Sequence, residues 1–475
     1  RSVVDVLSLG SGVGMDVHMA RMGGARNIDA VEINPAMTRA LTKFRSFGGD
    51  VCDQPGVECH QSEGRVFVKR SKKKYDLIVS ALTVMSKGHA GAMIESYVST
   101  LEAAQDYYDH LTEKGMVAYF IRSPLSAERW FVTCLETLKR KLKVSHTDAL
   151  SHLAILTSPR SPFNYLVLMS RSPFSADELD VMEEFASQFG RRRAVIPGRA
   201  ETSQVQELRR TGSYPTTFQA QHGLIDINPA TDNKPFFNDV HVSLPRAIRE
   251  MLYLALSIAL VFGVSAALQI SRAKTGGSLI DRKWLMLWTV YFAPLGVGFM
   301  LVEIGLIQAF ILLTGSPTQT VALVLLGLLS GGACASYFSQ GIGSDCLVKY
   351  AVYIALSVAA ATLLLSQSTA AISDALLGAG QSFRVLSILV ICAVIGAPMG
   401  ALFPTGLRLV AHHGKGWVPY FWGVNGVASV VGSVLAATGA KQAQGKAKAR
   451  QGFTITYYRV HIYGSVRVST RVSHL

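Results

Sequence analysis

Long stretches without a charged residue dominate the second half of the 475-residue chain. No Asp, Glu, Lys or Arg occurs between Met251 and Ile270, between Trp284 and Val302, or between Ile304 and Ser344. A helix needs about 20 apolar residues to cross the hydrocarbon core of a bilayer. These stretches are too long and too evenly apolar for the core helices of a soluble protein. They predict an all-α, multi-pass transmembrane bundle over 250–440, with about six helices at 251–270, 285–313, 318–338, 347–367, 385–406 and 417–438.

The net charge of +14 is spread unevenly along the chain. Residues 1–250 hold 31 Lys+Arg and 28 Asp+Glu, an ordinary soluble composition, whereas residues 441–475 alone hold seven Lys+Arg and no acid. The basic clusters at 72–74 and 191–193 are not interleaved with aromatic residues, as a nucleic-acid platform would be. We therefore expect no nucleic-acid partner. The basic tail at 441–475 stays unassigned; such a tail beside a membrane favours anionic lipid.

Apolar strand-like and helix-like segments alternate through the first 200 residues. We expect strands at 3–9, 27–33, 57–60, 75–81 and 116–121, and helices at 16–22, 64–70, 95–111 and 126–142. A further helix is expected to open at Pro35, and two last strands at 152–157 and 165–170 are expected to pair as a hairpin. This alternation predicts an α/β Rossmann-like domain with a mostly parallel sheet over 1–200. Residues 201–249 would connect it to the bundle.

A glycine-rich turn follows the first expected strand, with glycines at positions 10, 12 and 14. Dinucleotide sites favour the spacing G-x-G-x-x-G, which would require a glycine where this chain has Met15. The G-x-G-x-G form found here is the one used with S-adenosyl ligands. Glu32 ends the second strand, where a carboxylate can accept the ribose hydroxyls. Glu63, just before Gly64, ends the third strand and could meet the adenine amine. The alternative is a Rossmann-like domain that has lost its ligand.

These residues resemble the spermidine synthase (polyamine aminopropyltransferase) branch of the class I methyltransferase superfamily. More closely, the chain resembles membrane proteins that fuse such a domain to transmembrane helices, and the resemblance covers about residues 1–440. The motifs that carry it are Gly10-Ser-Gly-Val-Gly-Met-Asp16, Val31-Glu-Ile-Asn-Pro35, Glu63-Gly-Arg65, Tyr75-Asp-Leu-Ile78, Ala230-Thr-Asp-Asn-Lys-Pro-Phe-Phe237, Gly298-Phe-Met-Leu-Val-Glu-Ile-Gly-Leu-Ile-Gln308, Phe403-Pro-Thr-Gly-Leu-Arg408 and Trp422-Gly-Val-Asn-Gly-Val-Ala-Ser-Val-Val-Gly432. In that family the N-terminal hairpin region lies upstream of the position that matches Arg1, so we expect the domain to be N-terminally truncated here.

The resemblance implies an S-adenosylmethionine or decarboxylated S-adenosylmethionine donor, a small acceptor such as a polyamine, and no metal. Carried over residue by residue, the donor pocket would be lined by Gly10, Gly12, Gly14, Asp16, Glu32, Glu63 and Gly64. The chain departs from the family after the fourth strand, where two aspartates normally hold and deprotonate the acceptor amine. Those positions are Ala81 and Val84 here, and neither can titrate.

Replacements for the missing acids are few. His89 lies in the loop after the fourth strand, and Glu95 and Tyr97 are expected to begin the next helix. A loop histidine near a cofactor can serve as a base, but a solvated loop residue is the better explanation. An acid in a first helical turn often only complements the helix dipole. Asp76 reads as structural, and Cys52 and Cys59 as free thiols, because six cysteines without a C-x-x-C pair indicate neither a zinc module nor a disulfide scaffold.

Two polar residues in the second expected span, Glu303 and Gln308, are candidates for an intramembrane role. Glycines such as Gly331 and Gly400 would let helices pack closely, and Pro294, Pro398 and Pro404 would break or kink the spans. We expect an integral protein of a bacterial inner or plasma membrane, in contact with the lipid bilayer.

The orientation is open to opposing arguments. The positive-inside rule would place the basic loop at 272–283 in the cytoplasm and hence the domain outside. S-adenosyl ligands are cytosolic, which favours the opposite orientation. We expect a cytoplasmic domain. Two functions remain: a membrane-bound aminopropyl- or methyltransferase, and a non-enzymatic transporter-like or sensor protein with a degenerate Rossmann-like domain.

Overall fold

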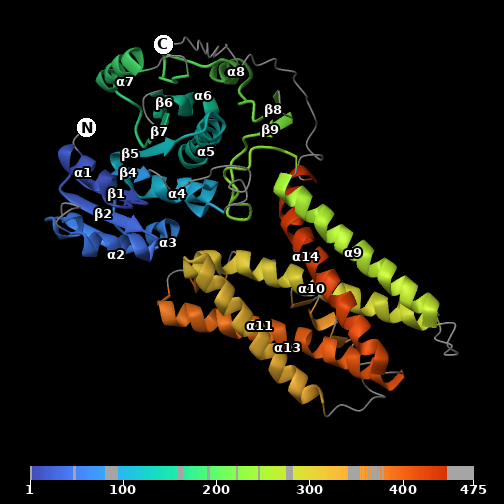
Figure 1. The fold of residues 1–475 in the computed structure, drawn as a ribbon. Helices are drawn as coiled ribbons and strands as arrows, with labels where there is room; N and C mark the ends of the chain where they lie inside the picture. The colour runs from blue at the N-terminus through green and yellow to red at the C-terminus, as the bar shows by residue number, and fades with distance from the viewer. Residues whose placement is uncertain are drawn as a thin grey trace, which may run out of the picture.

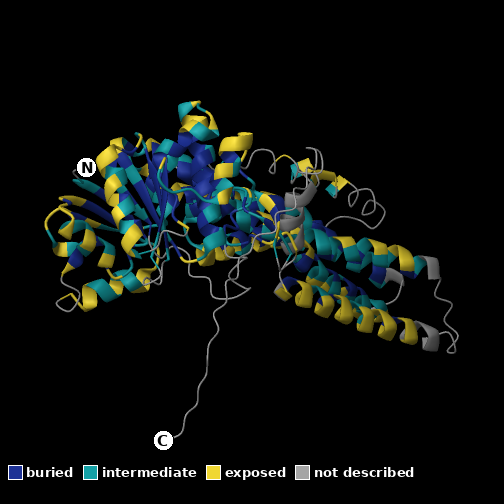
Figure 2. Ribbon diagram, turned by 90° about the horizontal axis from the view of Figure 1, so that it is seen from above, coloured by how far each residue is buried: buried dark blue, intermediate teal, exposed yellow. Residues whose placement is uncertain are grey.

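The structure is a computed structural model that describes residues 3–45, 50–80, 95–158, 164–189, 193–220, 223–243, 246–273, 282–340, 379–413 and 415–446, with scattered residues between 353 and 376. Two parts follow one another along the chain (Figure 1): an α/β domain and a bundle of long helices. In Figure 2 buried residues gather around the sheet of the α/β domain, whereas exposed residues run along the bundle helices.

A seven-stranded sheet forms the centre of the α/β domain, in the order β3-β2-β1-β4-β5-β7-β6. Its strands are β1 (Asp5–Leu9), β2 (Asn27–Glu32), β3 (Val57–Gln61), β4 (Tyr75–Ser80), β5 (Leu111–Ile121), β6 (Leu153–Thr157) and β7 (Tyr165–Ser170). Strands β1 to β5 pair in parallel, and β7 is antiparallel to both β5 and β6. This confirms the α/β Rossmann-like, methyltransferase-type fold class and the final hairpin.

Two apolar cores lie on opposite faces of the sheet, and successive residues of a strand belong to them in turn. Val6 of β1 packs with Val17 of α1 (Met15–Met22) and with Val51 on one face. Leu7 and Leu9 pack on the other face with helices α3 (Gly64–Arg70), α4 (Leu101–Asp109) and α5 (Pro124–Leu142). The period of two residues in a strand explains the division, because neighbouring side chains point to opposite faces. Because β1 to β5 are parallel, the described helices that follow them start at the same edge of the sheet.

Smaller elements complete the domain and lead to the bundle. They are α2 (Pro35–Lys43), η1 (Val51–Asp53), η3 (Tyr97–Ser99), α6 (His146–Ala149), η4 (Leu150–His152), α7 (Ala176–Phe189), α8 (Ser203–Thr211), β8 (Thr217–Ala220) and β9 (Gly223–Asp226). The buried Arg129 of α5 donates to the backbone carbonyls of Asp226, Phe236 and Phe237. The connecting segment is thus held against the domain core.

Two expectations about the domain are wrong. Cys52 and Cys59 form a disulfide rather than two free thiols, with Cα atoms 5.6 Å apart. The turn η1 brings Cys52 beside β3, a proximity that the spacing of seven residues does not reveal. The helix expected at 95–111 starts later: Tyr97 begins only the short 3-10 helix η3, and α4 starts after its N-cap Thr100, which accepts from the Ala103 N–H at 3.1 Å.

The bundle contains α9 (Arg246–Ala273), α10 (Arg282–Thr314), α11 (Pro317–Ser339), α13 (Gln381–His413), the short η6 (Lys415–Trp417) and α14 (Val418–Lys446). Five candidate spans occur among the described residues: Ile248–Leu268, Trp284–Thr314, Pro317–Ser339, Gln381–Ala411 and Val418–Ala436. They support an integral membrane protein. The expected span at 347–367 lies mostly outside the described residues. Pro294, Pro398 and Pro404 do not break their helices, since α10 and α13 continue through them.

Glycines make the closest helix contact in the bundle. A Cβ placed on Gly331 of α11 would lie 2.1 Å from the Ala393 carbonyl of α13, and one on Gly400 would lie 2.2 Å from the Gly332 Cα. Only glycine permits this backbone approach. Gly426 of α14 makes no such contact, since a Cβ there would meet nothing within 4 Å.

Candidate functional site

The glycine-rich turn joins the C-terminal end of β1 to α1. Gly10, Gly12 and Gly14 have φ angles of 75°, 55° and 89°, a region that residues with a Cβ rarely adopt. The Gly10 and Ser11 amides both donate to the Val31 carbonyl of β2. Around Gly12 the outer side is open, because a Cβ there would meet only the Gly10 carbonyl, at 3.9 Å. A ligand can therefore approach the backbone at this point.

Glu32 lies at the end of β2, beside the turn, as the sequence predicts. Its two carboxylate oxygens accept from the Gly12 amide at 2.9 Å and from the Asn34 amide at 2.7 Å. A carboxylate has about four lone-pair positions, so this one can hold the turn and still accept hydroxyl groups. Asp16, in the first turn of α1, has a pKa raised by burial. These residues fit an S-adenosyl ligand, for which the ribose contact of Glu32 stays a prediction.

Glu63 and Gly64 start α3 at the same edge of the sheet. Glu63 is the N-cap of α3 and accepts from the Val66 amide at 2.9 Å, and burial raises its pKa. A Cβ on Gly64 would lie 3.1 Å from Val98 and 3.4 Å from Leu9, which directly precedes the glycine turn. The adenine contact expected of Glu63 stays a prediction. The hydrogen bond that its carboxylate accepts comes from the Val66 amide, within α3.

The membrane bundle covers this edge of the domain. A Cβ on Gly315, in the turn between α10 and α11, would lie 3.1 Å from the Glu63 Cβ. Val66 of α3 belongs to the same apolar cluster as Leu306 and Phe310 of α10. At the other end of α3, Arg70 donates to the Ala379 carbonyl at 2.7 Å. The sequence gives no signal for this contact between α3 and the bundle.

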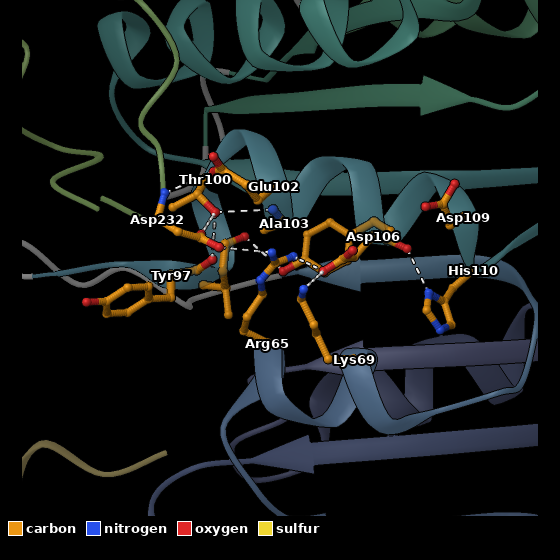
Figure 3. A network of polar contacts seen from close by, with 12 residues as sticks. Arg65, Lys69, Tyr97, Thr100, Glu102, Ala103, Asp106, Asp109, His110 and Asp232 are labelled. Carbon is orange, nitrogen blue, oxygen red and sulfur yellow. Dashed lines mark hydrogen bonds and ion pairs between the residues drawn. The ribbon is translucent and has the colours of Figure 1, made fainter. Parts of the chain in front are cut away.

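A buried arginine joins α3 to α4 and to the connecting segment (Figure 3). Arg65 is 1% exposed and pairs with Asp106 of α4 and with Asp232, the latter at 3.1 Å. Asp232 accepts from the Thr100 hydroxyl at 2.6 Å, and its amide donates to Glu102 at 2.9 Å. The two motifs that contain Arg65 and Asp232 are therefore parts of one ion-pair network, which the sequence separation of 167 conceals.

Glu95, Tyr97 and Gln308 meet where the domain touches α10. The Tyr97 phenol lies 3.3 Å from the Glu95 carboxylate and 3.2 Å from the backbone carbonyl of Gln308. The Gln308 side chain also hydrogen bonds to Glu95. Burial raises the pKa of Glu95 more than these two hydrogen bonds lower it. The sequence singled out all three residues but did not bring them together.

Other candidates stand apart from this junction. His89, Ala81 and Val84 lie outside the described residues. Glu303 lies five positions before Gln308 on the same helix, α10. Asp76 accepts from the Val4 and Asp5 amides and from the Thr112 hydroxyl, which agrees with a structural role.

The ligand atoms of Asp29, Glu58 and His60 lie within 4.8 Å of one another, a spacing that could hold a metal ion. The Lys73 ammonium lies among them, 3.0 Å from both Asp29 oxygens and 3.4 Å from Glu58. Burial raises the pKa of Asp29, but hydrogen bonds from His60, Lys73 and Tyr75 together hold it below the ordinary value. A lysine thus supplies the positive charge that a metal would bring.

No family model matches the chain, and no curated protein matches it. Solved structures with partial likeness include spermidine synthase from Thermotoga maritima, which is 16% identical over 39% of this chain and 59% of that one, with a TM-score of 0.29. A probable spermidine synthase from Corynebacterium glutamicum is 15% identical over 45% and 72%, with a TM-score of 0.31. Human methyltransferase-like protein 13 in complex with SAH is 17% identical over 43% and 89%, with a TM-score of 0.29. The sheet order itself defines the fold class.

Proposed function

We propose that this protein is an integral membrane transferase whose α/β domain binds S-adenosylmethionine or its decarboxylated form. The observation that carries the proposal is the turn of three positive-φ glycines at the end of β1, held by Glu32 from the end of β2. When bound, the donor supplies an electrophilic carbon beside a sulfonium. The chain supplies an open backbone at Gly12 and carboxylates at Glu32 and Glu63, at one edge of the sheet. The transferred group would be methyl or aminopropyl.

Calorimetric titration of the purified full-length protein tests the proposal directly. We expect binding of S-adenosylmethionine, its decarboxylated form or methylthioadenosine, and a loss of about tenfold or more in affinity for Glu32→Ala, because two charge-assisted hydrogen bonds hold the turn. The control variant Glu113→Gln removes an exposed carboxylate of β5 and should bind normally. Absence of heat with all three ligands contradicts the proposal. Preference for the decarboxylated ligand would favour aminopropyl transfer.

A second candidate function is a membrane sensor or transporter-like protein that uses the domain as a ligand-binding module. The contact of α3 with the bundle favours it, because Glu63 and Val66 touch the turn and the apolar cluster of the membrane helices. The disulfide Cys52–Cys59 also bears on this choice, because disulfides persist in oxidising compartments.

Reporter fusions after Arg249 and after Lys283 separate the two functions. The transferase predicts a cytoplasmic signal after Arg249, where the donor is available, and a signal from the opposite side after Lys283. An external signal after Arg249 would agree with the disulfide and favour the sensor.

A further inference from the structure

Glu95 is a largely buried carboxylate without a cationic partner among the described residues. Its hydrogen bonds come from two neutral groups, the Tyr97 phenol and the Gln308 side chain. Removing a carboxylate from water is costly unless a positive charge compensates for it. Other buried acids nearby have such a charge, since Asp106 and Asp232 both pair with Arg65. Glu95 is thus suited to a cation that the described residues do not supply.

The domain holds Glu95 in a defined place. The Ser96 amide donates to the Pro235 carbonyl at 2.7 Å, and the Leu101 amide to the Ala230 carbonyl at 2.8 Å. Val98 lies against Gly64, at the start of α3. The segment 95–101 therefore reaches from the donor edge of the sheet to α10, with Glu95 at the end nearest the membrane helix.

The length of α10 places this junction at the edge of the bilayer. Its apolar span runs over 31 residues, from Trp284 to Thr314, which is longer than the hydrocarbon core requires. Trp284 and Trp288 mark one boundary, because tryptophans collect at membrane–water interfaces. Gln308 lies 20 positions beyond Trp288, which is about 30 Å of helix and matches the thickness of the core. Glu95 thus meets α10 near the layer of lipid headgroups.

We propose that Glu95, held by Tyr97 and Gln308, binds the ammonium group of an amine-bearing phospholipid headgroup at this boundary. The headgroup ammonium carries three N–H donors, which suit a carboxylate. A quaternary headgroup has none and would be bound less well. Gln308 is a positioning residue here, since its amide orients the carboxylate from the membrane side.

The covalent step rests on the proposed function. Glu95 would first take a proton from the bound ammonium, and the freed lone pair of the nitrogen would then bond to the carbon beside the sulfonium. The carbon–sulfur bond breaks with its electron pair on sulfur, which leaves a neutral thioether. Glu95 then stands in for the acids missing at Ala81 and Val84. Lipid binding needs no donor, so it is tested separately from the transfer.

The test is lipid retention by the full-length protein in native mass spectrometry, after reconstitution in vesicles with equal amounts of phosphatidylethanolamine and phosphatidylcholine. We expect about tenfold preference for phosphatidylethanolamine, the effect of one charge-assisted hydrogen bond. Glu95→Gln should abolish the preference and Gln308→Leu should weaken it, whereas Glu113→Gln should keep it. Acidification should also abolish it, at a pH above the ordinary glutamate range, because burial favours the neutral carboxyl.

Equal retention of the two lipids, or an unchanged preference in Glu95→Gln, would overturn the proposal. If Glu95→Gln fails to fold, the milder Tyr97→Phe variant and the pH profile of the native protein decide the matter. Putrescine, a free amine in solution, serves as a comparison ligand. If putrescine binds in a Glu95-dependent manner and no lipid is preferred, the proposal is overturned and the amine comes from solution. A negative result in the lipid or putrescine experiments does not change the result of the donor titration. The two proposals can therefore fail independently.

Discussion

The phenol of Tyr97 lies 3.2 Å from the backbone carbonyl of Gln308, although 211 positions separate the two residues. Tyr97 belongs to the α/β domain and Gln308 to the membrane helix α10, so the contact joins the two parts of the chain. Both residues lie beside Glu95, whose carboxylate has no counter-ion among the described residues. The α/β domain and α10 therefore meet at one polar junction.

Arg65 is expected to be the most sensitive position of the ion-pair network. Arg65→Ala leaves Asp106 and Asp232 without their buried cation, and such a loss costs about 3–5 kcal/mol of unfolding free energy. Arg140→Ala breaks an exposed pair with Glu136 and should cost only about 0.5 kcal/mol. Thermal unfolding in detergent compares the two, and equal shifts would show that the network does not stabilise the domain.

Gly14 and Gly24 provide a matched pair for the donor turn. Both have positive φ, of 89° and 95°, but a Cβ on Gly14 would lie 2.7 Å from Val51 whereas one on Gly24 meets nothing within 4 Å. Each change to alanine should cost about 1–2 kcal/mol of backbone strain. Only Gly14→Ala should also displace the turn and reduce donor affinity in calorimetry. Equal affinities of the two variants would exclude Gly14 from the donor site.

Gly331 and Gly426 test the packing of the bundle in the same way. Gly331→Ala forces α11 away from the Ala393 carbonyl and should destabilise the protein by about 1–3 kcal/mol. Gly426→Ala lies in open space within a helix and should be neutral or stabilising by up to about 1 kcal/mol. Thermal unfolding in detergent gives both values, and a destabilised Gly426→Ala would contradict the packing described here.

Glu128 should make stability depend on pH. Burial, only partly offset by Arg193, raises its pKa to about 7, from an ordinary value of 4.5. The folded protein therefore keeps a proton that the unfolded chain releases, and stability falls as the pH rises from about 4.5 to about 7. At pH 8 the loss is up to about 3 kcal/mol, so Glu128→Gln should be stabilising there and nearly neutral at low pH.

Glu136, on the same helix α5, is the control for this pH effect. Hydrogen bonds from Arg140 and His146 outweigh its partial burial and lower its pKa. Its contribution to stability is therefore present above its unfolded pKa and is lost as the pH falls through its folded pKa. Glu136→Gln should thus destabilise the protein at neutral pH. Melting curves of both variants across pH should show opposite signs, and parallel curves would rule out the assignment.

Reduction of the Cys52–Cys59 disulfide should lower the unfolding free energy by about 2–3 kcal/mol, the value for closing so short a loop. Cys134, Cys334 and Cys392 are free thiols, which a reductant leaves unchanged, so among the described cysteines it acts at the disulfide. The double variant Cys52→Ser/Cys59→Ser should be less stable and should not respond to the reductant. A response in the double variant would place the redox-sensitive group elsewhere.

Local sequence patterns predicted much of the fold. The bounds of α3 and β7 match the expected segments 64–70 and 165–170, because each is a short apolar run between strong turn or cap residues. The helix α4 starts later than the sequence predicts, because the Thr100 cap sets its start. Hydropathy alone located the five described spans, as expected where the solvent is lipid.

Long-range contacts could not be predicted in this way. The Arg65–Asp232 pair and the Tyr97–Gln308 contact join residues that are 167 and 211 positions apart, and no periodicity encodes such distances. The sequence identified Glu95, Tyr97 and Gln308 as separate candidates in two different domains. Only the docking of α10 on the domain brings them together.

The helix α3 has a mechanical consequence for the whole protein. It is seven residues long, about 10 Å, with Glu63 under the α10–α11 turn at one end and Arg70 bound to Ala379 at the other. A rod so short and so firmly attached at both ends moves as a unit. A ligand that moves the start of α3 would therefore also move its contacts with the α10–α11 turn and with Ala379.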